Sequence, residues 1–134
     1  MAVYTKIDDQ DLEQYLKKYD IGELVKITEI IDGIDNSNFI IETKQNKFIL
    51  TIFEKRINPA DLPFFINLKK HLASKKISCP APIVDKSGQM INKIANKDSV
   101  IVSFLQGKTL KPNTNGYYLT ITNKHCQEVL LFLF

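Results

Sequence analysis

Hydrophobic residues recur at three- and four-residue intervals between Asp8 and Tyr19, and Gly22 follows at a position where helices commonly end. This spacing predicts a short amphipathic helix near the N-terminus. From Leu24 onward, apolar and polar residues nearly alternate, which is typical of strands. Three strands are expected, at Leu24 to Ile31, Phe39 to Ile41 and Phe48 to Phe53.

The breaks between these strands, residues 32–38 and 44–47, consist of residues that tolerate tight turns. They predict a three-stranded antiparallel meander. After the third strand, Asn58 and Pro59 predict an N-cap and a proline in the first turn of a helix. The apolar stripe from Leu62 to Leu72 has helical spacing and indicates about four turns.

The second half of the chain predicts the rest of the sheet. Pro80 and Pro82 indicate an extended segment, residues 86–89 indicate a turn, and the apolar run from Ser99 to Leu105 indicates a strand that ends before Gly107. The expected fold is α+β: a five-stranded antiparallel sheet, a helix before it, and a second helix packed between the third and fourth strands. A polar connector and the start of a further helix are expected within residues 108–134.

Composition and charge exclude several classes of protein and partner. Hydrophobic residues make up 44% of the chain and charged residues 25%, which excludes wholesale disorder. The net charge is only +3, its lysines are scattered, and Arg56 is the single arginine, so a nucleic-acid partner is not expected. Cys79 and Cys126 form no C-x-x-C pair, and no apolar stretch approaches the ~20 residues that cross a bilayer. A cytoplasmic protein without a membrane partner is expected.

Several local sequences resemble the type II homoserine kinases, a branch of the aminoglycoside and choline kinase superfamily. As a set these local sequences are specific. The resemblance runs from Tyr4 to about Val129. The segments that carry it are Tyr19 to Gly22, Gly33 to Phe39, Phe48 to Arg56, Pro59 to Phe65 and Ile101 to Gly107. It implies the small, nucleotide-binding lobe of a protein-kinase-like fold for residues 1–107, and for residues 108–134 a linker and the first helix of a second lobe.

In that superfamily a hairpin loop closes over the nucleotide. The matching positions here are Gly33, Asn36, Ser37 and Asn38, and ATP is the implied cofactor. Glycine lets the backbone approach a triphosphate, and successive N–H groups in a turn form a small anion-binding concavity. The alternative is that these residues are simply turn formers.

The resemblance also places the adenine beside Ser103, Phe104 and Leu105, where the small lobe passes into the large one and backbone groups meet the base. The identity of the side chains matters little at such a site. These residues also fit a buried strand, and both interpretations can hold together.

One departure from the superfamily concerns the basic residue that contacts the nucleotide phosphates. The third strand of most relatives carries a Lys or Arg that contacts the α- and β-phosphates, and Thr51 stands at that position here, with Phe65 at the position of its acidic partner. The homoserine kinase branch itself has a threonine in this motif. Lys55 lies on the same strand face but about 13 Å further along, so it compensates only if the strand bends or the alignment shifts.

No catalytic or metal-binding residue is assigned. Phosphoryl transfer needs a group that orients the acceptor hydroxyl and carboxylates that hold Mg²⁺, and the superfamily supplies both from the large lobe. The clustered Asp8, Asp9 and Asp11 are expected to favour a helix N-terminus instead. His71 and His125 have no second ligand at metal-binding spacing.

Three hypotheses follow. The first is the nucleotide lobe of a homoserine kinase, which makes O-phosphohomoserine on the route to threonine and is inactive without its second lobe, whether or not that lobe is encoded separately. The second is a non-catalytic module that binds nucleotide or a partner chain. The third is a remnant of a decayed kinase gene. The apolar residues from Val129 to Phe134 predict self-association if they are exposed.

Overall fold

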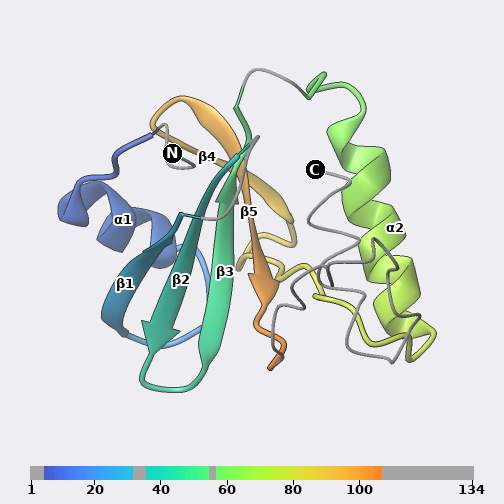
Figure 1. Ribbon diagram of the computed structural model, residues 1–134, viewed down its shortest axis with the longest axis horizontal. Helices are drawn as coiled ribbons and strands as arrows, with labels where there is room; N and C mark the ends of the chain where they lie inside the picture. The colour runs from blue at the N-terminus through green and yellow to red at the C-terminus, as the bar shows by residue number, and fades with distance from the viewer. Residues whose placement is uncertain (1–4, 32–35, 55–56, 107–134) are drawn as a thin grey trace, which may run out of the picture.

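The computed structural model describes residues 5–31, 36–54 and 57–106 (Figure 1). Their elements are α1 (Asp9–Leu16), β1 (Leu24–Ile30), β2 (Ser37–Thr43), β3 (Lys47–Ile52), α2 (Leu62–Ser74), β4 (Ile91–Ile94) and β5 (Lys97–Ser103). The strands form one sheet in the order β1-β2-β3-β5-β4, and all neighbouring strands are antiparallel. The predicted α+β fold, with a helix between the third and fourth strands, is confirmed.

The two helices lie on opposite sides of the molecule, with the sheet between them (Figure 1). Side chains that alternate along β3 enter two separate apolar clusters, because successive residues of a strand point to opposite faces. One cluster joins Leu50 and Ile52 to Leu12 and other residues of α1. The other joins Ile49, together with Phe53 directly after the strand, to Leu62 and Ile66 of α2. The middle of the sheet is therefore buried on both faces.

Several predicted boundaries were wrong, among them those of the fifth strand, which runs from Lys97 to Ser103 and not from Ser99 to Leu105. The second strand begins at Ser37 and not at Phe39, because Ser37 and Asn38 pair with Ile52 and Thr51 across the ladder. The second helix begins at Leu62. Asn58 forms a turn before it, in which the Asn58 Oδ1 accepts a hydrogen bond from the backbone N–H of Ala60 at 3.2 Å.

The turn expected at residues 86–89 is present and is organised by one carboxylate. The Asp85 Oδ1 accepts hydrogen bonds from the backbone N–H groups of Ser87 and Gln89 and from the Ser87 hydroxyl, at 2.7–2.9 Å. The Asp85 Oδ2 accepts one from the Asn92 amide at 3.0 Å. These donors, the Ser87 hydroxyl first, lower the pKa of Asp85 to about 2. The turn leads directly into β4, the strand that the hydrophobic pattern did not locate.

A series of hydrogen bonds attaches α1 and the residues after it to β5 and to the edge strand β4. The Asn92 amide donates to the Tyr19 hydroxyl at 2.9 Å, and the hydroxyls of Tyr15 and Tyr19 lie 3.1 Å apart. The buried Ser99 hydroxyl donates to the Tyr15 hydroxyl at 2.8 Å. Burial and the neighbouring Tyr19 raise the pKa of Tyr15. Both tyrosines therefore serve as neutral groups that position α1 on the sheet.

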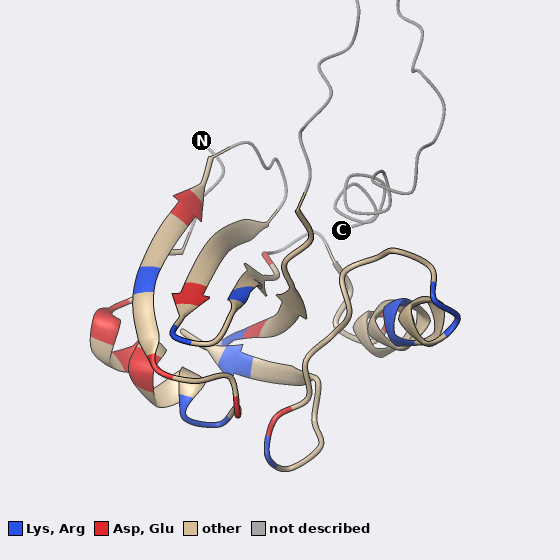
Figure 2. Cartoon of the chain, turned by 90° about the horizontal axis from the view of Figure 1, so that it is seen from below, with Lys and Arg blue, Asp and Glu red and all other residues tan. Residues whose placement is uncertain are grey.

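Charge is divided unevenly between the helices (Figure 2). Helix α1 carries only acidic charges, and Asp9 and Asp11 lie in its first turn, where the helix dipole favours them. Helix α2 carries only lysines among its charged residues. Within the described ranges, none of the helices has both the length and the apolar character needed to cross a membrane.

The two-sided core yields a stability prediction. Ile41 is fully buried in the α1-facing cluster, and Val25, on the edge strand β1, is 63% exposed. We expect Ile41→Ala to lower the free energy of unfolding by about 2–5 kcal/mol and Val25→Ala to change it by less than about 0.5 kcal/mol. Urea denaturation followed by circular dichroism measures both. Equal effects of the two substitutions would contradict this description of the core.

Candidate functional site

The candidate residues between β1 and β3 are held by polar contacts at the start of β2. Asn36, Ser37 and Asn38 are all buried, and Ser37 has no exposed surface. The Asn38 amide donates to the Asn36 carbonyl at 3.3 Å, which tightens the entry into the strand. Gly33 and Lys55, the other candidates in this region, lie outside the described residues.

Thr51 lies opposite Asn38 in the β2–β3 ladder, and the Thr51 hydroxyl donates to the Asn38 Oδ1 at 2.8 Å. Ile49 and Phe53 flank Thr51 at two-residue spacing and belong to the α2-facing cluster, so Thr51 points to the same side. Phe65, at the position of the expected acidic partner, packs against this same cluster. Positions 51 and 65, which align with the ion pair of most relatives, carry no charge here. Asn38 and Thr51 place two neutral polar groups on an otherwise apolar face.

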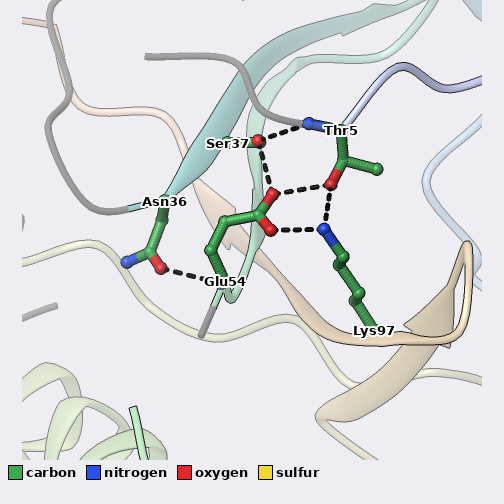
Figure 3. Close-up of polar contacts among 5 residues, drawn as sticks. All are labelled: Thr5, Asn36, Ser37, Glu54 and Lys97. Carbon is green, nitrogen blue, oxygen red and sulfur yellow. Dashed lines mark hydrogen bonds and ion pairs between the residues drawn. The ribbon is translucent and has the colours of Figure 1, made fainter. Parts of the chain in front are cut away.

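A second polar network surrounds the carboxylate of Glu54, two residues beyond β3 (Figure 3). The Glu54 Oε1 accepts hydrogen bonds from the hydroxyls of Ser37 and Thr5 at 2.8 and 2.6 Å. The Glu54 Oε2 pairs with the ammonium group of Lys97, which also donates to the Thr5 hydroxyl at 2.7 Å. The network thus joins the N-terminal segment, β2, the end of β3 and β5.

The electrostatics of this network favour an ionised carboxylate. Burial raises the pKa of Glu54, but hydrogen bonds from Lys97, Thr5 and Ser37, together with the charge of Lys97, outweigh burial and bring the pKa below its ordinary value. The Glu54 side chain is 10% exposed and that of Lys97 36%. Lys97 is consequently engaged with Glu54 and Thr5.

The other candidates, Ser103, Phe104 and Leu105, lie at the opposite end of the sheet. Ser103 is the last residue of β5 and pairs with Phe48, three residues before Thr51 on β3. At ~3.3 Å per residue this separation is about 10 Å. Phe104 and Leu105 follow the last pair of the ladder and are half-buried. The two groups of candidates therefore lie at the two ends of one short path along β3.

The surface between these ends is apolar. Ile40 and Ile49 are direct cross-strand partners, and both contribute to the α2-facing cluster together with Phe104. At the Ser103 end of this strip, the backbone N–H of Ser103 donates to the Ala81 carbonyl at 2.9 Å and that of Phe104 to the Lys47 carbonyl at 3.4 Å. Among the described residues, no group of three or more His, Cys, Asp or Glu side chains is placed to hold a metal ion.

Two shallow hollows occur elsewhere on the molecule. One, of about 270 Å³, lies between α2 and the segment before β4 and is lined by Ile66, Met90 and their neighbours. The other, of about 310 Å³, surrounds Asp85 and Lys18. Neither hollow is lined by any of the candidate residues.

Sequence reasoning missed the Glu54 network. Glu54 lies within the segment from Phe48 to Arg56 that carries the family resemblance. A carboxylate directly after a buried strand was the one signal in the sequence that could have pointed to it. Lys97 and Thr5 offered no such signal, since each is an ordinary polar residue far from Glu54 in the sequence. Only the folded sheet brings the three together.

The sequence profile of the phosphotransferase enzyme family matches residues 26–133, which is most of the chain. The chain belongs to this family. The profile includes all the candidate residues and also residues outside the described ranges.

Curated relatives add a closer likeness. The chain is 47% identical to the homoserine kinase of Azorhizobium caulinodans over 114 residues, which are 85% of this chain and 36% of that protein. It is 47% identical to the homoserine kinase of Bartonella tribocorum over 130 residues, which are 96% of this chain and 38% of that protein. The chain thus spans little more than a third of the length of these relatives.

Solved structures agree on the fold. A spectinomycin phosphotransferase, determined with ADP and spectinomycin, superposes with a TM-score of 0.62 at 11% identity, over 78% of this chain and 31% of that one. A microcompartment-associated aminopropanol kinase superposes with a TM-score of 0.58 at 14% identity, over 73% of this chain and 32% of that one. At such low identity these structures show a shared fold and nothing further.

The Asn38–Thr51 contact yields a second prediction. Thr51→Val removes the hydroxyl that the buried Asn38 Oδ1 accepts from, so we expect the free energy of unfolding to fall by about 1–3 kcal/mol. Thr28→Val, at an exposed position on β1, is the matched control and should change it by less than about 0.5 kcal/mol. Urea titration of both variants measures the difference. A Thr51→Val variant as stable as the control would show that the hydrogen bond contributes nothing.

Proposed function

We propose that this chain is the nucleotide-binding lobe of an ATP-dependent kinase that phosphorylates L-homoserine to O-phospho-L-homoserine, a step of threonine biosynthesis. The observation that carries the proposal is the 47% identity to homoserine kinases over 85–96% of the chain. The ADP held by a phosphotransferase of the same fold supports nucleotide as the ligand. A cytoplasmic location is part of the same proposal.

The nucleotide is proposed to lie along the α2-facing side of the sheet. The base contacts the backbone of Ser103 to Leu105, and the phosphates extend toward Thr51 and the segment from Gly33 to Asn38. The path of about 10 Å along β3 between these two ends is compatible with an extended nucleotide. Because Thr51 is uncharged, phosphate contacts in this lobe are proposed to come mainly from backbone N–H groups, with Lys55 as the one candidate cation.

The remaining chemistry is assigned to parts of the relatives that this chain does not span. We propose that residues 1–107 form the nucleotide lobe and that residues 108–134 lead into a second lobe, which supplies the Mg²⁺ ligands, the residue that orients the homoserine hydroxyl, and the acceptor contacts. Bound Mg²⁺ would neutralise charge between the phosphates. If that lobe is a separate polypeptide, it is the proposed partner, and the apolar residues 129–134 are then a proposed point of association.

The proposed base contact is tested at Leu105. Leu105→Pro removes the backbone N–H that would meet the adenine edge, whereas Leu105→Ala keeps it. By isothermal titration of the full chain with ATP and Mg²⁺, we expect Leu105→Pro to weaken binding about tenfold and Leu105→Ala to change it less than about threefold. Inorganic tripolyphosphate, which has no base, should bind both variants equally.

Two outcomes would contradict the nucleotide proposal. If the unaltered chain does not bind ATP at millimolar concentration, the proposal that it binds a nucleotide is wrong. Equal ATP affinities for Leu105→Pro and Leu105→Ala, with both variants folded by circular dichroism, would remove the base contact while leaving nucleotide binding itself in place.

The acceptor is tested by supplying the proposed second lobe, as a continuation of the chain or as a separate polypeptide, and measuring ADP release with L-homoserine. We expect turnover with L-homoserine at least tenfold faster than with L-serine, which is one methylene shorter. The chain by itself should release no ADP above background. A complex that binds ATP but does not phosphorylate L-homoserine would contradict the proposed substrate.

A further inference from the structure

The last residue of β5 forms two hydrogen bonds with Ala81, and the second of them departs from the usual strand pattern. The Ser103 backbone N–H donates to the Ala81 carbonyl at 2.9 Å. The Ala81 backbone N–H donates in return at 2.9 Å, but to the hydroxyl oxygen of the Ser103 side chain. Pro82 and Val102 form an antiparallel bridge, which places Ala81 directly opposite Ser103.

This arrangement leaves the Ser103 carbonyl without its ladder bond. In a regular antiparallel ladder, two bonded residues that face each other exchange both N–H···O=C bonds. Between Ala81 and Ser103 the hydroxyl takes the place of the Ser103 carbonyl as acceptor. On the other edge of β5, the Phe104 N–H donates to the Lys47 carbonyl at 3.4 Å. Because bonded and non-bonded pairs alternate, the preceding pair, Ser103 with Phe48, is a non-bonded one, and neither neighbouring described segment donates to the Ser103 carbonyl.

The hydroxyl and the proposed nucleotide lie on opposite sides of the sheet. Ile101, two residues before Ser103, belongs to the α1-facing cluster, whereas Val102 belongs to the α2-facing one. Since side chains alternate along a strand, the Ser103 hydroxyl lies on the α1-facing side, and the Ala81 N–H donates to it there. Ser103 and the two residues after it are half-buried, so the strand end is not fully covered. The α2-facing side of the Ser103 carbonyl is therefore available to a base.

A carbonyl at this point discriminates between purines. Adenine carries an exocyclic amino group, which donates hydrogen bonds. Hypoxanthine has a carbonyl oxygen at the same position, which only accepts. The Ser103 carbonyl can accept from the amino group of adenine, next to the Leu105 N–H that the proposed base contact uses as a donor. With hypoxanthine, two acceptors would face each other and neither would be satisfied.

We propose that the Ser103 side chain determines the preference of this site for adenine, because its hydroxyl binds the Ala81 N–H and so leaves the Ser103 carbonyl to accept from the amino group of the base. This inference rests on the proposed nucleotide-binding function. It gives a role to the side chain at position 103, and not to the backbone alone.

The test compares Ser103→Ala with Ser74→Ala in the full chain, by isothermal titration with ATP and with ITP, its hypoxanthine counterpart, each with Mg²⁺. Ser74 is a matched control, because its hydroxyl also bonds to a backbone group, the His71 carbonyl at 2.6 Å, but at the exposed end of α2. We expect the unaltered chain and Ser74→Ala to bind ATP about tenfold more tightly than ITP. In Ser103→Ala the Ala81 N–H turns to the carbonyl, so the two affinities should agree within about threefold.

A double variant separates this role from a loss of packing. Ala81→Pro removes the N–H that would bond to the carbonyl, and it keeps the Ala81 carbonyl as acceptor for the Ser103 N–H. We expect Ser103→Ala combined with Ala81→Pro to regain a preference for ATP of about tenfold. Ser103→Thr, which keeps the hydroxyl, should retain the preference. If Ser103→Ala does not fold, Ser103→Cys, whose thiol is a weak acceptor, replaces it with the same expectations.

NMR without ligand supplies a readout that does not depend on nucleotide binding. A scalar coupling across the hydrogen bond, between the backbone nitrogen of Ala81 and the carbonyl carbon of residue 103, is expected in Ser103→Ala and not in the unaltered chain. The coupling between the nitrogen of residue 103 and the Ala81 carbonyl carbon should appear in both, and it serves as the internal control. The first coupling in the unaltered chain, or its absence from Ser103→Ala, would overturn the proposal.

The titrations separate this inference from the function on which it rests. Failure of the unaltered chain to bind ATP overturns both. If the unaltered chain binds ATP and ITP equally, or if Ser103→Ala keeps the preference for ATP, the inference alone is wrong. It is also wrong if Ser103→Ala loses affinity for ATP and ITP alike, or if the double variant does not regain the preference, since these patterns indicate general destabilisation.

Discussion

The burial of β3 on both faces is the constraint on which the rest of this structure depends. A strand with two buried faces needs a neighbour on each edge and a covering element on each side, and the chain supplies β2, β5, α1 and α2. Because alternate residues enter different clusters, a shift of one residue would exchange the two sets of side chains. The register is therefore strongly determined, and it places Thr51 opposite Asn38.

That constraint explains which parts of the fold could be predicted from sequence. The strands from Leu24 to Phe53 and the first helix have clear periodicity, and their existence and order were correct. The start of β2 was misplaced because serine and asparagine favour turns locally, whereas Ser37 and Asn38 gain partners in Glu54 and Thr51 once the sheet has formed. β4 is only four residues long, too short for its alternation to be recognised.

The residues of the candidate site were chosen from the sequence and their role stays a prediction, whereas the contacts that support them were not visible in the sequence. Resemblance to a known family pointed to both ends of the β3 path, and the family membership of the chain is established by most of its length. The absence of a basic residue at position 51 was visible in the sequence. The pairing of Glu54 with Lys97 was not, because no local pattern links two polar residues that lie so far apart in the sequence. Contacts of this kind exist only as a product of the tertiary fold.

The spacing of that network along the chain has a consequence for folding order. Its contacts join residues that are 32, 43, 49 and 92 positions apart in the sequence. Contacts between such distant residues form only after the intervening chain has been ordered, since the entropy of loop closure opposes them until other interactions compensate. Hairpins β1–β2 and β2–β3 need only neighbouring residues. The entry of β2 therefore acquires its final geometry late, after the sheet that carries it.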